Sequence, residues 1–340
     1  MKIFNGVSAN EVWLKAVKEI KKNYPSNLIK SQFGNTFEIM HAGFTIKDPT
    51  KRWVMSKYPP INIAFSLIEV IWIIRGRQDA KFLTYWNTKL PLFAGYSKYY
   101  HGSYGFRLRK NFGVDQLSRI TDILSNNRST RQAILQIWDV RKDLPNKNGN
   151  PKNRDIPCNV NSLLKIRNEK LEWMQIIRSN DLLLGVPYNF VQFTFLQEII
   201  AGWLGVGIGD YNQISDSLHL YENSYDDLRS TLPHRSFKSV DSISFPKRIS
   251  ESLFKELEKR VEKLIKSDLT VNEHLKLSNW DSAPSSFLNI FLVLSAEAAR
   301  RRKWDDLANE IISLCKNPAY CYLWNNWQKE ILKKRALKNM

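Results

Sequence analysis

The spacing of apolar residues alternates between helical and strand periods along this chain, and these changes constrain the fold more than any other feature. Residues 9–23 carry apolar side chains at helical spacing, and residues 62–75 are dense in Ile, Leu and Trp, which predicts a buried helix. Residues 133–138 then read as a strand, whereas the pattern from about residue 250 to the end is helical again. Helices on both sides of a block of strands predict an α+β fold.

A polar loop precedes most of the expected strands. Pro, Asn, Lys and Gly dominate residues 144–155, which indicates an exposed loop. The other expected elements are strands at 37–46, 160–167, 171–177 and 211–221, and helices at 115–125 and 190–204. The short polar link between the strands at 160–167 and 171–177 predicts a hairpin.

A glycine run, Gly205-Val206-Gly207-Ile208-Gly209, invites comparison with a dinucleotide-binding loop. Such a loop links a strand to a helix, because it uses the helix N-terminus to hold phosphate. Here the run follows an expected helix. We therefore interpret it as a turn into the next strand.

Length and charge set the broad class. The 340 residues are enough for one large domain or two modest ones, and we predict a catalytic body at 1–230 with a helical C-terminal part at 231–340 packed on it. No apolar run approaches the roughly 18 residues that span a bilayer, and the first residues show no signal peptide, so we expect a cytoplasmic protein. The net charge of +18 permits an anionic substrate or nucleic acid, but the basic residues are spread along the chain, and nucleic acid is not expected.

Cysteine and histidine are too sparse for several chemistries. Three cysteines form no disulfide framework, and Cys315 and Cys321 in the helical tail read as small buried apolar residues. No pair of the five histidines has metal-ligand spacing, so no metal site is expected. Cys158 opens a strand directly after the polar loop. A cysteine in that place, taken alone, is more often structural than functional.

Several short motifs occur in a fixed order around Cys158. They are Ile156-Pro157-Cys158-Asn159, Arg178-Ser179-Asn180-Asp181, Gly185-Val186-Pro187-Tyr188-Asn189 and Ser217-Leu218-His219-Leu220-Tyr221, preceded by Glu69 in an apolar run, Tyr104-Gly105, Asp115-Gln116 and Thr130-Arg131-Gln132. Together, over about residues 30–225, they resemble the thymidylate synthase family. The resemblance implies a mixed β-sheet flanked by helices, and a homodimer. It also implies transfer of a one-carbon unit from 5,10-methylenetetrahydrofolate to C5 of a pyrimidine nucleoside monophosphate.

The resemblance assigns the covalent chemistry to three side chains. Cys158 matches the thiolate that adds to C6 of the pyrimidine and makes C5 nucleophilic, and a nearby arginine would raise its thiolate fraction. Glu69 matches a general acid/base that acts on O4 through water, with a pKa raised by burial; the structural alternative is an ion pair. Tyr104 matches a tyrosine that helps to remove the C5 proton.

The phosphate of the substrate needs forked cationic donors. Arg178 and Ser179 match the phosphate-binding pair of the family, although Arg178 alone would read as a surface charge. Arg131 matches an arginine that a second subunit lends to the same phosphate. The family usually has arginine at the next position too, where this chain has Gln132. Lys30 or Arg52 is a candidate for a further phosphate contact, and the residues do not choose between them.

The base, sugar and folate contacts follow from the same resemblance. Asn189 matches the base reader, and an amide can accept from N3–H and donate to O4 of uracil. His219 and Tyr221 match the pair that holds the sugar hydroxyl, whereas a lone histidine there would read as a core residue. Asp181 and Gly185 match positions on the folate side.

Three departures from the family fall on the half of the site that performs the final reduction. Asn159 replaces the usual histidine after the nucleophile, tryptophans are absent from residues 88–96, and the chain ends in a basic helix at 333–338. We therefore favour slightly a hydroxymethylated product from a uridylate-type substrate such as dUMP. The alternatives are a thymidylate synthase proper, which releases dihydrofolate, and a non-catalytic relative that binds nucleotides or RNA.

Overall fold

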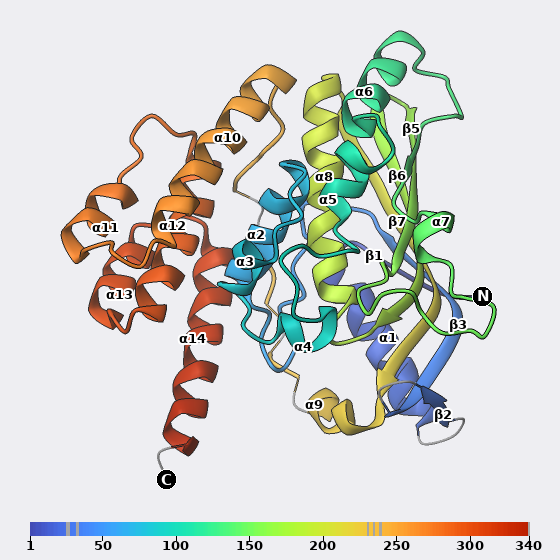
Figure 1. Cartoon of the computed structure of the whole chain (residues 1–340), viewed down its shortest axis with the longest axis horizontal. Helices are drawn as coiled ribbons and strands as arrows, with labels where there is room; N and C mark the ends of the chain where they lie inside the picture. The colour runs from blue at the N-terminus through green and yellow to red at the C-terminus, as the bar shows by residue number, and fades with distance from the viewer. Residues whose placement is uncertain (25–27, 32–33, 230, 234, 238–239, 339–340) are drawn as a thin grey trace.

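A computed structural model describes the chain except residues 25–27, 32–33, 230, 234, 238–239 and 339–340 (Figure 1). The strands are β1 Lys2–Gly6, β2 Leu28–Ser31, β3 Gly34–Ile46, β4 Ile134–Gln136, β5 Asn159–Arg167, β6 Lys170–Asp181 and β7 Gly207–Tyr221. The helices are α1 Ala9–Asn23, α2 Ile63–Ile74, α3 Ala80–Thr84, α4 Leu90–Ala94, α5 Tyr104–Phe106, α6 Gln116–Asn126, α7 Val140–Asp143, α8 Val186–Leu204, α9 Tyr225–Arg229, α10 Lys247–Leu264, α11 Val271–Ser278, α12 Ser285–Arg301, α13 Asp305–Ser313 and α14 Pro318–Lys338, with single turns η1 Arg107–Asn111 and η2 Glu222–Ser224.

The strands form one mixed sheet in the order β1-β3-β7-β6-β5-β4, with β2 paired to β3. The pairs β1–β3 and β6–β7 are parallel, and the other neighbouring pairs are antiparallel. A parallel pair needs a crossover connection, and α8 provides it between β6 and β7. The predicted fold, a mixed sheet flanked by helices with further helices at the C-terminus, is confirmed.

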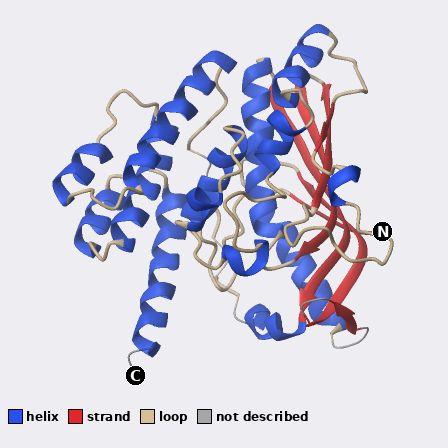
Figure 2. Ribbon diagram, in the orientation of Figure 1, coloured by secondary structure: helices blue, strands red, loops and turns tan. Residues whose placement is uncertain are grey.

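The long helices cover one face of the sheet (Figure 1). Figure 2 shows α1 and α8 on that face, α2 beyond them, and α10 to α14 as an outer layer. We call the opposite face the outer sheet face. Half-buried apolar side chains lie on it and alternate along the strands with the buried side chains of the inner face. They are Val160, Leu163, Met174, Ile176 and Ile214. Apolar side chains left half-open on a sheet are candidates for burial by another surface.

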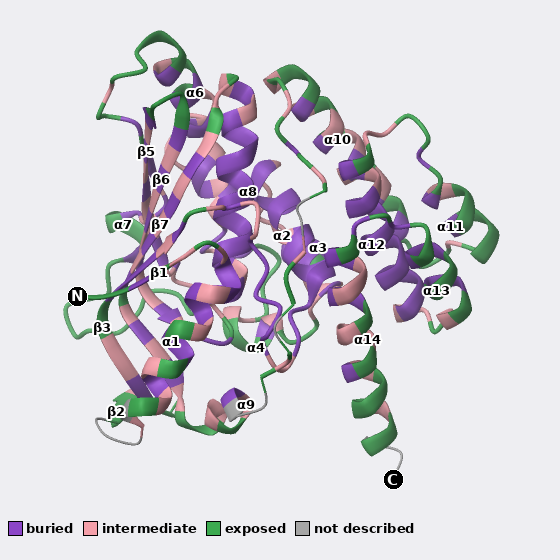
Figure 3. Ribbon diagram, turned by 180° about the vertical axis from the view of Figure 1, so that it is seen from behind, coloured by how far each residue is buried: buried purple, intermediate pink, exposed green. Residues whose placement is uncertain are grey.

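The predicted buried helix at 62–75 is α2, and it lies at the centre of the molecule. Asn62 caps it by accepting a hydrogen bond from the Phe65 N–H at 3.0 Å. Every residue of α2 except Glu69 is buried, between α8 on one side and α12 and α14 on the other (Figure 3). Burying a carboxylate in such a helix costs free energy unless a partner compensates it, so the position of Glu69 indicates a functional role.

The expected elements are confirmed, with several longer than expected. The strand at 171–177 runs on to Asp181, the helix at 190–204 begins at Val186, and the strand at 211–221 begins at Gly207. Gly205 has φ 64° and ends α8 in the left-handed conformation, so the glycine run is a turn as expected.

The C-terminal helices share one hydrophobic core with the body, from Phe4 to Trp324. The division at 230/231 stays a prediction, and Ser230 lies outside the described residues. Within the described part of the chain, no helix has the length and apolar character needed to cross a membrane.

Candidate active site

Cys158 lies between the polar loop and β5, and Arg178 of β6 holds it there. The Arg178 N–H donates to the Cys158 carbonyl at 2.9 Å, and the Arg178 Nε donates to the Pro157 carbonyl at 3.0 Å. The same guanidinium places Nη2 4.0 Å from the Cys158 Sγ. The predicted thiol–arginine pair is therefore present, because β5 and β6 are neighbours in the sheet.

Two opposing effects act on the Cys158 thiol. Burial raises its pKa above the ordinary value and the negative charge of Asp155 adds to the rise, whereas Arg178 lowers it. The net direction is upward. Arg178 thus acts as the sequence predicted, but desolvation outweighs it, and the thiol of the free protein holds its proton at neutral pH.

Glu69 points from α2 toward Gln192 of α8. Its Oε2 atom is buried without a hydrogen-bond partner among the described residues, although part of the side chain stays open. Burial raises the pKa of Glu69 to about 8, and the nearby Gln192 offsets part of that rise. Gln192 accepts a hydrogen bond from the Asn189 Nδ2 at 3.1 Å. Glu69, Gln192 and Asn189 therefore form one line of polar groups.

Tyr104 begins α5 and lies close to Cys158. Its pKa is raised far above the ordinary value, by burial first and then by the charges of Cys158, Asp155 and Glu69. Asn159 lies beside the Tyr104 hydroxyl and offsets part of the rise. The structure thus brings together the three side chains predicted for covalent chemistry.

Asn159, which replaces the histidine usual in the family, is fully buried. Its Oδ1 accepts a hydrogen bond from the Gln175 Nε2 at 3.0 Å, and Gln175 accepts one from Ser162 at 2.6 Å. The amide thus anchors Cys158 to the polar interior of β5 and β6 and supplies no titratable group near neutral pH.

The carboxyl ends of the parallel strands β6 and β7 carry Ser179, Asp181, His219 and Tyr221. Asp181 pairs with His219 in the β-ladder, and the His219 ring packs edge-on against Tyr221 at 5.4 Å between centroids. The pKa of Tyr221 is raised by burial and by the charges of Asp181 and Cys158, so Tyr221 lies near both. Ser179 lies one pleat before Asp181 and pairs with Ser217.

Asp181 turns the chain into α8 and leaves one oxygen free. Its Oδ1 accepts the N–H groups of Leu183 and Leu184 at 2.7 and 2.6 Å, whereas its Oδ2 is buried without a partner among the described residues. Gly185 follows in close contact, since a Cβ there would lie 2.4 Å from the Asn180 side-chain oxygen. An unpaired buried carboxylate oxygen can accept a hydrogen bond from an N–H donor of a ligand.

Arg131 lies apart from this cluster. It is exposed ahead of β4, and in the described residues its side chain has no hydrogen bond or ion pair. Lys30 is exposed on β2. Arg52 is buried in an ion pair with Glu198, which gives it a structural role and removes it as a candidate phosphate contact.

Two side chains that the motifs did not point to belong to the site's surroundings. Asp155 lies three residues before Cys158 and acts on both the thiol and Tyr104. Lys57 is buried, donates to the Pro59 carbonyl at 2.6 Å and has its pKa lowered to about 8, by burial against the attraction of Asp181. A lysine or aspartate outside a motif reads as a surface charge, so only packing could identify them.

Helix α14 contacts the loop that precedes α2. The Tyr58 hydroxyl donates to Glu330 of this helix at 3.1 Å, and Glu330 also pairs with Lys334 at 3.0 Å. Trp324 is fully buried in the same helix. The C-terminal helix is thus docked beside the loop that precedes α2.

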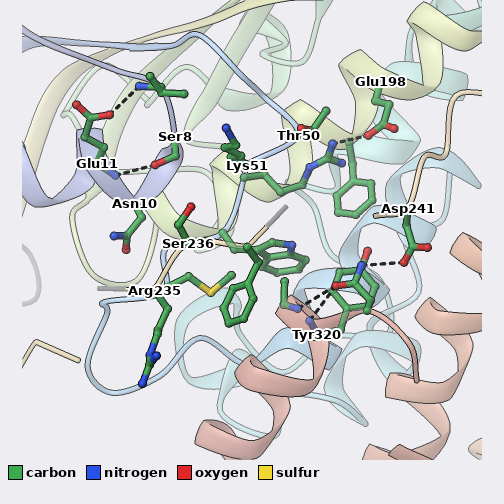
Figure 4. Close-up of a pocket in the computed structure, with 18 of the residues that line it drawn as sticks. Ser8, Asn10, Glu11, Thr50, Lys51, Glu198, Arg235, Ser236, Asp241 and Tyr320 are labelled. Atoms are coloured by element: carbon green, nitrogen blue, oxygen red, sulfur yellow. Dashed lines mark hydrogen bonds and ion pairs between the residues drawn. The ribbon is translucent and has the colours of Figure 1, made fainter. Parts of the chain in front are cut away.

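A hollow in the structure lies away from the cluster around Cys158. Its volume is about 290 Å³, and of the residues that the sequence proposed for the site only the candidate Arg52 lines it. Figure 4 shows Glu11 of α1, Glu198 of α8, and Asp241 and Tyr320 around it. Its buried charges are paired inside the chain, Glu198 with Arg52 and Asp241 with asparagine amides. The described residues contain no cluster of three or more His, Cys, Asp or Glu that could hold a metal ion.

Comparison with known proteins assigns the fold that carries the cluster around Cys158 to a family. Residues 43–279 match the family described as thymidylate synthase, so the chain belongs to the thymidylate synthase family. A deoxyuridylate hydroxymethyltransferase of Bacillus phage SP01 is 32% identical over 236 residues, which cover 66% of this chain and 60% of that protein.

Two further relatives have different names, one a hydroxymethyltransferase and the other a thymidylate synthase. A deoxyuridylate hydroxymethyltransferase of Delftia phage PhiW-14 is 30% identical over 208 residues, 58% of this chain and 57% of that protein. A thymidylate synthase of Clostridium beijerinckii is 29% identical over 145 residues, 43% of this chain and 50% of that protein. The chain spans about half to three-fifths of the length of the phage relatives.

Proposed function

We propose that this protein transfers a one-carbon unit from 5,10-methylenetetrahydrofolate to C5 of a uridylate-type nucleotide, dUMP, and releases the 5-hydroxymethyl product. The observation that carries this proposal is the convergence of Arg178, Glu69, Tyr104 and Asn189, from four different elements, with Cys158 of the loop before β5. A binding protein would not need a thiol, an acid of raised pKa and a buried tyrosine together.

Each side chain has a step in this scheme. Cys158 adds to C6, so that C5 becomes nucleophilic and attacks the methylene carbon. Glu69 is protonated near neutral pH because its pKa is about 8, and it supplies a proton toward O4. Tyr104 assists removal of the C5 proton. Asn189, oriented by its bond to Gln192, reads N3–H and O4.

The phosphate end is completed by a second copy of the chain. Arg178 and Ser179 are the contacts that one chain supplies. Arg131 is exposed and has no partner in its own described chain, which suits a residue that is lent to another site. The half-buried apolar outer sheet face supplies a surface for a homodimer.

Two observations bear on the product. Three hydroxymethyltransferase relatives and the neutral Asn159 favour addition of water to the methylene carbon as the final step. The docking of α14 at Tyr58 favours the second candidate, a thymidylate synthase proper, because a helix there could replace the family's closing tail. We favour hydroxymethylation.

The folate product distinguishes the two. The protein is incubated with dUMP and 5,10-methylenetetrahydrofolate while near-ultraviolet absorbance is followed. Methylation converts the folate to dihydrofolate and raises the absorbance, whereas hydroxymethylation releases tetrahydrofolate without that rise. Stoichiometric dihydrofolate would refute the hydroxymethyl product. Absence of tritium release from 5-tritiated dUMP, UMP, dCMP and CMP would refute the transferase itself and favour a non-catalytic nucleotide-binding relative.

A further inference from the structure

Two chain segments run side by side at the nucleophile. The Gly102 N–H donates to the Asp155 Oδ2 at 2.8 Å, and a Cβ on Gly102 would lie 2.9 Å from the Asp155 carbonyl oxygen. Two residues further along one segment is Tyr104, and three residues further along the other is Cys158. The contact between Gly102 and Asp155 therefore fixes an acid beside the reacting pair.

A buried ion pair stabilises the segment that contains Gly102. Arg107 and Asp143 are fully buried and bonded in a fork, with distances of 2.9 Å for both nitrogen–oxygen pairs. The Arg107 Nη2 also donates to the His101 carbonyl at 3.0 Å, and the His101 ring contacts Asp143 at 2.8 Å. Because His101 precedes Gly102, this network holds in place the N–H group that binds Asp155.

Only one oxygen of Asp155 is used. Its Oδ1 accepts no hydrogen bond within the described part of the chain, and the residue is partly open. After burial, the charge of Asp155 is among the causes that raise the pKa of both Cys158 and Tyr104, so the carboxylate lies near both groups. Burial also raises the pKa of Asp155, whereas Gly102 and the charges of His101 and Arg107 lower it, and the net rise makes it a stronger base.

We propose that Asp155 is the catalytic base that binds and deprotonates the water that attacks the one-carbon unit. This role rests on the proposed function. Once the folate nitrogen has left, C5 carries an exocyclic methylene group. The water oxygen bonds to that carbon as one water proton passes to the Asp155 Oδ1, and the electron pair of the exocyclic double bond moves into the ring toward O4. The pair then returns to form the C5–C6 double bond, the C6–S bond breaks, and Cys158 leaves as a thiolate that takes back the proton.

A partition experiment tests this role. With 5-tritiated dUMP, 5,10-methylenetetrahydrofolate and 2-mercaptoethanol, the exocyclic methylene is captured either by water, as the alcohol, or by the thiol, as a thioether. Mass spectrometry gives the ratio of alcohol to thioether per tritium released. Asp155→Asn keeps an acceptor for Gly102 but loses the base, and we expect the ratio to fall roughly 100-fold, the usual effect of a general base. Asp155→Glu should recover part of the ratio.

Asp122→Asn is the matched control, because this aspartate is exposed on α6 and the chemical change is identical. The control should keep the wild-type ratio. A ratio within about threefold of wild type in Asp155→Asn would overturn the role of Asp155. Wild-type tritium release with only methylated product would overturn it too, while the C5 transfer stands. No tritium release in the wild type would instead overturn the proposed function, and this role with it.

Discussion

Glu69 should make the stability of the protein depend on pH in a way that one substitution removes. Its pKa is about 8 in the folded chain against an ordinary 4.5. The folded protein therefore keeps a proton that the unfolded chain loses between these values. Proton binding by the folded state alone means that the free energy of unfolding falls as pH rises through this window. Below pH 4.5 both states are protonated and the contribution is fully present.

The size of the effect follows from the same values. Each tenfold change in acidity is worth about 1.4 kcal/mol, so full burial corresponds to about 5 kcal/mol between the two ends of the window. Part of Glu69 stays open to the site, and water there weakens the desolvation. We therefore expect roughly 2–5 kcal/mol.

The assay compares the free energies of unfolding of two proteins at two pH values. Urea unfolding of wild type and Glu69→Gln is measured at about pH 5 and about pH 8 at one protein concentration, because a dimer's stability depends on concentration. Other titrating groups cancel in the comparison. The advantage of wild type over the variant should shrink as pH rises. Glu310→Gln, at an exposed residue of α13, should show no such trend. A constant difference within about 0.5 kcal/mol would refute a buried, protonated Glu69.

Three further outcomes follow from the site. Cys158→Ser should lower turnover and tritium release by more than tenfold while dUMP binding by calorimetry persists, because the phosphate contacts remain. Mixed Cys158→Ala and Arg131→Ala chains should regain about a quarter of wild-type activity after random pairing, since half the dimers are hybrids with one complete site; inactive hybrids of proven composition would exclude sharing of Arg131. Asn189→Asp should shift preference in kcat/KM from dUMP toward dCMP, as each mispaired buried group costs roughly 1–3 kcal/mol; a wild type that prefers dCMP would show the base assignment to be wrong.

The fold was predictable where the pattern of apolar residues is long or the turn chemistry specific. The apolar density of α2 marked it as buried, and the hairpin between β5 and β6 has Asn168 and Glu169 at φ 50° and 55°, the left-handed backbone of a two-residue turn. Short elements such as α3 and α4 were missed because five residues show no period. Strand β6 was cut short at 177 because its last residues are polar, and these residues belong to the site.

The site was predictable only as far as the family motifs extend. Glu69, Cys158 and Asn189 were predicted from such motifs, and the structure brings them together. Asp155 and Gln192 were missed because their roles depend on neighbours that are distant in sequence, Gly102 in one case and Glu69 in the other. The rise in the Cys158 pKa was also missed, since burial of a thiol cannot be judged from the residues beside it.

Strand β6 places two kinds of selection on one row of side chains. Met174 and Ile176 point to the outer sheet face, and the next side chain of the same parity is Arg178, whose guanidinium reaches Cys158. Because successive side chains alternate between faces, a slip of one residue would exchange the whole row. Sequence changes at the surface where two copies are proposed to meet are therefore restricted by the need to keep Arg178 at the nucleophile. Changes near the nucleophile are restricted in turn by the need to keep that surface. We expect β6 to change more slowly during evolution than β4, whose Ile134 pairs with Leu163 of the outer sheet face but which places no side chain at the nucleophile.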